Sequence, residues 1–117
     1  MRFRVLAACA AISFVSIAAA QAQSTNDGTW AVTLITQSGG CDPSLRSSIR
    51  DSAGRVNEQS FFARISGGID QAGKVALQVV KGADSIAARG TVKGQQASGS
   101  WNSPSRNCTG SWMATRI

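Results

Sequence analysis

The chain has no histidine and no tyrosine, and only six of its residues are acidic, with Glu58 as the one glutamate. Histidine is the side chain best suited to proton transfer near neutral pH and a common zinc ligand. The many serines therefore have no histidine base, and the carboxylates do not form a convergent pair. The sequence predicts no catalytic residue, no metal site and no cofactor, so we do not expect an enzyme.

Long hydrophobic runs are also missing, apart from one near the N-terminus. Two arginines precede apolar and small residues over 5–20, and Ala20 and Ala22 form an A-x-A cleavage pattern. This arrangement is typical of a secretory signal peptide, and the run is shorter than the about 20 residues that span a bilayer. We predict a helical signal peptide over 1–22, no membrane span after its cleavage, and a periplasmic or secreted bacterial location.

Cysteine is scarce, and removal of residues 1–22 would leave one pair, Cys41 and Cys108. The remaining 95 residues suffice for one small domain, whose limited buried surface gives marginal stability without a covalent staple. Because exported proteins fold in an oxidising compartment, we predict a disulfide between these cysteines. Two free thiols or a metal site are the alternatives.

Apolar and polar residues alternate along the rest of the chain, and no segment has the spacing of an amphipathic helix. After a short flexible tail at 23–27, this pattern predicts one all-β domain over 28–117. The motif Asp-x-Ala-Gly at 51–54 and 70–73 predicts two turns of the same type, with Gly54 in the left-handed conformation that a hairpin with a bulge requires. The expected strands cover residues 30–34, 45–50, 55–59, 61–69, 75–79, 86–92, 97–101 and 108–115.

About eight short strands joined by tight turns predict a small antiparallel up-and-down meander barrel, with a β-sandwich as the alternative. A barrel is favoured because closure removes exposed strand edges. If the first and last strands pair, Cys41 beyond the end of one meets Cys108 at the start of the other. The same pairing is expected to make Trp30 and Trp112 neighbours.

Each of the three tryptophans, Trp30, Trp101 and Trp112, follows a glycine by two positions. An inward glycine at that spacing would leave room for the large ring. Buried tryptophans can plug the core of a small barrel, which is the favoured interpretation. As the alternative, tryptophans at a barrel mouth would stack on a sugar or an apolar ligand.

Basic residues outnumber acidic ones, with a formal net charge of +6 for the whole chain and +4 after residue 22. The basic residues are spread along the sequence and never form a run, which is typical of a solvated surface. We therefore expect no nucleic-acid partner and a monomeric protein. The expected partner is a small apolar or sugar ligand, or an anionic component of the cell envelope.

Four short motifs are spaced along most of the predicted mature chain. They are Gly28-Thr29-Trp30-x-Val32, Cys41-Asp42, Ala97-x-Gly99-x-Trp101 and Cys108-x-Gly110-x-Trp112-x-Ala114. Together they resemble the pattern of small exported β-proteins of alphaproteobacteria, a group of unassigned function. The resemblance implies export and a disulfide, but no reaction.

The chain is also similar in size, and in its Gly-x-Trp start, to small periplasmic inhibitors of metalloproteases. Its expected fold is similar to that of avidin-like binders, although a shared fold does not establish a shared function. We expect a non-catalytic exported binding or envelope-interaction module. The alternative is a periplasmic protease inhibitor that inserts the tail at 23–27 into an active site.

Overall fold

The structure, a computed structural model, describes residues 26–59 and 63–117. The described residues contain eight β-strands and no helix. The strands are β1 (Gly28–Ser38), β2 (Ser44–Asp51), β3 (Arg55–Gln59), β4 (Arg64–Ile69), β5 (Lys74–Lys81), β6 (Asp84–Lys93), β7 (Gln96–Ser103) and β8 (Cys108–Arg116). The signal peptide predicted at 1–22 lies outside the described residues, and so does the start of the strand predicted at 61–69.

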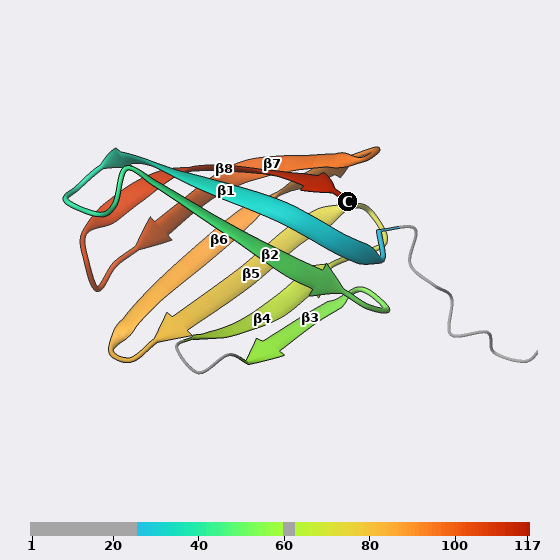
Figure 1. The fold of residues 1–117 in the computed structure, drawn as a ribbon, viewed down its shortest axis with the longest axis horizontal. Helices are drawn as coiled ribbons and strands as arrows, with labels where there is room; N and C mark the ends of the chain where they lie inside the picture. The colour runs from blue at the N-terminus through green and yellow to red at the C-terminus, as the bar shows by residue number, and fades with distance from the viewer. Residues whose placement is uncertain (1–25, 60–62) are drawn as a thin grey trace, which may run out of the picture.

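All eight strands belong to one antiparallel sheet, in the order β2-β1-β8-β7-β6-β5-β4-β3. Figure 1 shows that this sheet curls round into a barrel. The prediction of an all-β up-and-down barrel is therefore confirmed. The expected pairing of the first strand with the last is also present, along most of the length of β1 and β8.

Among the described strands, the wall of the barrel has one gap, which lies between β2 and β3. An isolated bridge joins Ser52 to Arg55 next to the turn. Further along, the backbone N–H of Arg50 donates to Oε1 of Glu58 at 2.7 Å, so a side chain spans the gap where the strands no longer pair. The two strands then diverge (Figure 1). The barrel is thus open between β2 and β3, the two strands of one hairpin. The sequence predicts a closed barrel and gives no position for a gap.

The prediction that Trp30 and Trp112 are neighbours is wrong, because the register of β1 against β8 places them at different levels. Trp30 lies opposite Arg116, whereas Trp112 lies opposite Leu34. The disulfide explains the difference, because Cys41 must come close to Cys108, near the start of β8. In an antiparallel pair, that constraint places a residue near the start of β1 opposite the end of β8.

The two Asp-x-Ala-Gly turns differ, although their sequences predict the same type. In the turn at 51–54, Ala53 and Gly54 both have positive φ, at 53° and 78°, as in a two-residue type I′ hairpin. In the turn at 70–73, only Gly73 has positive φ, at 80°, and its N–H donates to the carbonyl of the aspartate. The left-handed Gly54 is confirmed, but the bulged hairpin predicted with it is wrong, because Ser52 and Arg55 pair directly around a two-residue turn. The turn types differ because strand pairing continues one residue further into the first turn.

Asn26 and Asp27 are held against the barrel. The indole N–H of Trp30 donates to the carbonyl of Asn26 at 3.0 Å, and the N–H of Gly54 donates to Oδ1 of Asp27 at 3.4 Å. Asn26 is buried. The flexible tail predicted at 23–27 is therefore wrong for these two residues, because a buried indole N–H needs an acceptor.

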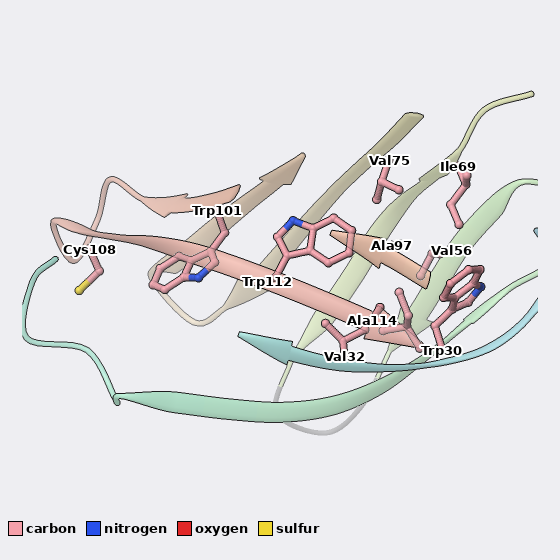
Figure 2. Packing of buried hydrophobic residues seen from close by; sticks show 11 residues of the cluster. Trp30, Val32, Val56, Ile69, Val75, Ala97, Trp101, Cys108, Trp112 and Ala114 are labelled. Carbon is pink, nitrogen blue, oxygen red and sulfur yellow. The ribbon is translucent and has the colours of Figure 1, made fainter. Parts of the chain in front are cut away.

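One end of the barrel, here called the closed end, is filled by a compact apolar cluster. Trp30, which is 1% exposed, packs there with Val56, Ile69 and Val75. Figure 2 shows that Trp112 lies further along the barrel and that Trp101 lies further still, beside Cys108. The three tryptophans are therefore spread along the barrel axis.

Candidate ligand-binding site

The interior of the barrel contains a cavity of about 660 Å³. Its wall is formed mainly by apolar side chains at alternating, inward-facing strand positions that nevertheless stay partly exposed. Among them are Leu34, Ile65, Leu77, Val79, Ile86 and Ala88. Partial exposure at inward positions means that the interior is not filled by side chains. The volume falls within the roughly 300–1,000 Å³ that is usual for small-molecule sites.

Trp101 and Trp112 line the cavity without filling it, because each ring lies against the backbone of the wall: that of Trp101 against β8, and that of Trp112, which reaches past β7, against β6. Trp101 faces Gly110, where an added Cβ would lie 2.6 Å from Nε1 of the indole. A Cβ at Gly90 would likewise lie 2.5 Å from Cζ2 of Trp112. Gly110 thus makes room for an indole, as predicted, but for the indole of the neighbouring strand.

Most polar groups of the wall are already hydrogen-bonded within the protein. The indole N–H of Trp101 donates to two backbone carbonyls at 3.2 and 3.1 Å, and that of Trp112 donates to a third at 3.1 Å. The hydroxyls of Thr36 and Ser103 also donate to backbone carbonyls, at 2.6 and 2.7 Å. A molecule in the cavity would therefore contact mainly apolar atoms and the faces of the two indoles.

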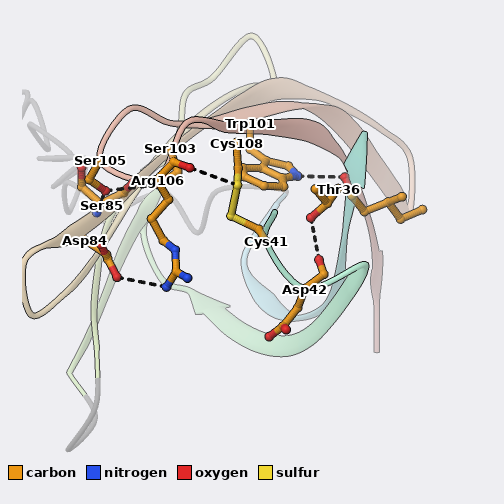
Figure 3. Close-up of a disulfide and its surroundings, with 11 residues drawn as sticks. Thr36, Cys41, Asp42, Asp84, Ser85, Trp101, Ser103, Ser105, Arg106 and Cys108 are labelled. Carbon is orange, nitrogen blue, oxygen red and sulfur yellow. Dashed lines mark hydrogen bonds and ion pairs between the residues drawn. A yellow bond between two sulfur atoms is a disulfide. The ribbon is translucent and has the colours of Figure 1, made fainter. Parts of the chain in front are cut away.

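The other end of the barrel, here called the mouth, is where the β1–β2 loop and the β5–β6 and β7–β8 turns lie. Its charged residues that line the cavity are Asp42, Arg46, Lys81, Asp84 and Arg106. Nη1 of Arg106 lies 3.3 Å from Oδ2 of Asp84, in an ion pair whose two side chains are largely exposed. Figure 3 shows this pair beside the disulfide.

The disulfide between Cys41 and Cys108 confirms the predicted pairing. It ties the β1–β2 loop to the start of β8, and Cys41 lines the cavity. Gly39, with a φ of 97°, brings the loop so close to the β7–β8 turn that a Cβ there would lie 2.5 Å from the carbonyl oxygen of Asn107. This side of the mouth is therefore fixed covalently and by close packing.

At the closed end, the guanidinium of Arg116 lies 5.0 Å from the centroid of the Trp30 ring, within the range of a cation–π contact. Asp51 is 1% exposed, and neither of its carboxylate oxygens has a hydrogen-bond partner among the described residues. Burial, and then the nearby charge of Asp27, raise the pKa of Asp51, while Arg116 lowers it, and the pKa that results is about 6.

Sequence reasoning missed the burial of Asp51 and interpreted it as an ordinary turn residue. The signal was present, because Asp51 continues the inward-facing alternation that passes through Ser47 and Ile49 in β2. The partly exposed apolar lining was also missed. Alternation shows which side chains face inward, but it does not show whether they meet across the barrel.

The described residues contain no group of three or more histidine, cysteine, aspartate or glutamate side chains that could hold a metal ion. Over the same ranges, no helix is long and apolar enough to cross a membrane. The carboxylate of Glu58, the one glutamate of the chain, accepts the backbone N–H of Arg50 across the gap. Oδ1 of Asp70 accepts the N–H of Lys74 within its turn at 2.8 Å.

The fold and the cavity define a small eight-stranded antiparallel barrel with a hollow interior that opens at one end. No protein-family model, curated protein or solved structure matches the chain. The resemblance to exported proteins of alphaproteobacteria therefore stays a prediction. A function for this chain has to be argued from the geometry and chemistry of its own cavity.

Proposed function

We propose that this protein is a non-catalytic, exported binding protein that holds a small apolar molecule inside its barrel. The observation that carries the proposal is the cavity of about 660 Å³ with its apolar wall. An eight-stranded barrel is just wide enough to be filled by side chains or to hold one small ligand. Here the inward positions carry small residues and flat-lying indoles, which leave the space open.

An apolar molecule suits the cavity better than a sugar. Sugars need hydrogen-bonding groups, and the indole N–H groups and two hydroxyls of the wall already donate to backbone carbonyls. Transfer of a polar ligand into such a space would leave its hydroxyls unsatisfied, at a cost of about 1–3 kcal/mol each. Apolar ligands incur no such cost, and they gain roughly 0.8 kcal/mol per buried methylene.

The cavity is also a better candidate than the N-terminal tail, which the protease-inhibitor alternative requires. Asn26 and Asp27, the last two residues of that tail, form hydrogen bonds with the barrel. The inhibitor hypothesis would therefore rest on residues 23–25, which lie outside the described ranges. The cavity supports the binding proposal with described residues alone.

Titration of the purified protein with N-phenyl-1-naphthylamine, a neutral apolar dye, tests the proposal. We expect saturable binding with one dye per chain, together with energy transfer from the tryptophans that line the cavity. Competition by dodecanol should release the dye. A dye signal that rises without saturation, or that dodecanol leaves unchanged, would contradict cavity binding.

Two neighbouring alanines on β6 give a matched pair of variants. Ala88 lines the cavity, whereas Ala87 is exposed on the outer face. The variant Ala88→Phe should bind the dye about tenfold more weakly, because extra volume in a packed site costs roughly 1–3 kcal/mol. Ala87→Phe should bind like the unaltered protein. Equal affinities of the two variants, with both shown to be folded by circular dichroism, would place the dye outside the barrel.

A further inference from the structure

The charged residues of the mouth are not balanced. Three cations line this end of the cavity, Arg46 from β2, Lys81 from the end of β5 and Arg106 from the β7–β8 turn. Two anions, Asp42 and Asp84, line it as well. The mouth therefore carries one more positive than negative charge, above a cavity whose wall is mainly apolar.

Pairing within this set leaves the net charge unchanged, with two cations, Arg46 and Lys81, against one carboxylate, that of Asp42. Arg106 and Asp84 neutralise each other in the ion pair at 3.3 Å. Arg46 and Lys81 form no ion pair with any residue in the described ranges, and both are exposed. Lys81 occupies an inward-facing register position, since it continues the alternation of Leu77 and Val79 along β5. Arg46 borders the cavity but lies opposite Thr33, at an outward-facing position of β2, so Lys81 is the cation that the register directs into the mouth and Arg46 lies at the outer edge of the rim.

The depth of the cavity fits a chain molecule. On β1, the residues that line it run from Trp30 at the closed end to Thr36 near the mouth. The six steps from residue 30 to residue 36, at about 3.3 Å each on a strand tilted by about 40°, give a depth of roughly 15 Å. A zigzag carbon chain with bonds of about 1.5 Å advances roughly 1.3 Å per bond, so a chain of about twelve carbons spans this depth.

We propose that the ligand is an anionic amphiphile, whose single hydrocarbon chain occupies the cavity and whose carboxylate or phosphate head lies at the mouth beside Lys81, with Arg46 at the outer edge of the same rim. This inference rests on the proposed function, because it names the class of molecule that the same cavity holds. The apolar wall accepts the chain. The head stays at the partly hydrated rim, where a charged group does not lose all of its water.

Four ligands with the same twelve-carbon chain test the assignment: dodecanoate, dodecyl phosphate, dodecanol and dodecyltrimethylammonium. Each is titrated by calorimetry below the concentration at which it forms micelles, at low ionic strength. Because exposed ion pairs contribute modestly, we expect one or both anions to bind about tenfold more tightly than dodecanol, and the cation to bind most weakly. Salt should reduce the preference for the anions, since the rim is open to solvent.

The two anionic ligands distinguish the sources of such a head. Tighter binding of dodecanoate indicates a free fatty acid, whereas tighter binding of dodecyl phosphate indicates a phospholipid-like head. Either order supports the proposal. Equal affinity for all four ligands, or the strongest affinity for the cation, would overturn the anionic head and leave the proposed function standing. If none of the four binds and N-phenyl-1-naphthylamine does not bind either, the proposed function itself fails.

A pair of double variants locates the head. The variant Arg46→Gln/Lys81→Gln removes two charges at the mouth, whereas Lys74→Gln/Lys93→Gln removes two at the closed end, and all four side chains are exposed. The first should lose the preference for anions and keep the affinity for dodecanol. The second should keep both. Equal loss of anion preference in the two variants would show that the net charge of the protein, rather than the mouth, attracts the ligand.

Discussion

Asp51 offers a sharp test of the structure, because its carboxyl group is buried at the closed end without a hydrogen bond from the described residues. Burial and the nearby charge of Asp27 raise the pKa of Asp51 from its ordinary value of 3.8 to about 6. The folded protein therefore holds this proton more tightly than the unfolded chain. We predict that Asp51→Asn, which keeps the size of the side chain and removes the charge, stabilises the protein at neutral pH.

The direction and size of the effect follow from proton linkage. Between pH 3.8 and about 6, the folded state binds more protons than the unfolded state, so the free energy of unfolding falls as the pH rises. Below this interval the unfavourable contribution is absent, and above it the contribution is complete. At about 1.36 kcal/mol per pH unit, the interval from 3.8 to about 6 corresponds to about 3 kcal/mol.

Urea unfolding followed by tryptophan fluorescence, at pH 4 and at pH 7.5, measures the effect. The advantage of Asp51→Asn over the unaltered protein should be about 2–3 kcal/mol larger at pH 7.5 than at pH 4. Other titrating groups are common to both proteins and cancel in this difference. Asp42→Asn, made at the exposed mouth, controls for the loss of an acidic residue as such. An advantage that is the same at both pH values would refute the burial of the Asp51 charge.

Three further predictions concern the frame of the barrel and are measured by urea unfolding at pH 7.5. Ala53→Asn should raise the free energy of unfolding by about 0.5–1 kcal/mol, since asparagine tolerates positive φ better than alanine and Asn-Gly suits a type I′ turn; no gain would contradict this turn. Replacing Cys41 and Cys108 by serine should lower it by about 4 kcal/mol for a crosslink that spans 67 residues, and a loss below about 1 kcal/mol would show that the crosslink constrains little. Gly110→Ala should lower the free energy of unfolding by about 2 kcal/mol or more, because its Cβ would meet an indole and a backbone carbonyl. The control Gly40→Ala, with open space around it, should be neutral. Equal effects of the two substitutions would contradict the close approach at Gly110.

The strands and the disulfide could be predicted from the sequence because they depend on local patterns and on elimination. Alternation marks each strand, as from Trp30 to Leu34 in β1. Only Cys41 and Cys108 remain as a pair once the predicted signal peptide is set aside. Even the weakness of β3 is visible, since Val56 is its one apolar residue.

The hollow interior and the gap could not be predicted, because both depend on how the strands meet in space. Three tryptophans suggest a filled core, yet Trp101 lies flat because Gly110 is opposite it on β8. That match depends on the register between the two strands. Alternation alone does not fix this register, because a shift by two residues leaves every side chain on the same face. The gap between β2 and β3 is likewise a property of the strand order in the sheet, which the pattern along one strand does not show.

Because the gap lies between β2 and β3, the order of the strands in the sheet begins and ends at different strands from their order in the chain. Every neighbouring pair of strands in the sheet is consecutive in the chain except β8 and β1, where the end of β8 lies beside the start of β1 and the N–H of Ile117 donates to the carbonyl of Thr29. If the ends were linked there and the chain cut at the β2–β3 turn, the same sheet would read as an uninterrupted meander from β3 to β2. All of its strand pairings would then be local. In the natural order, the β1–β8 pairing is the one that must form between distant segments, and the disulfide spans that same junction.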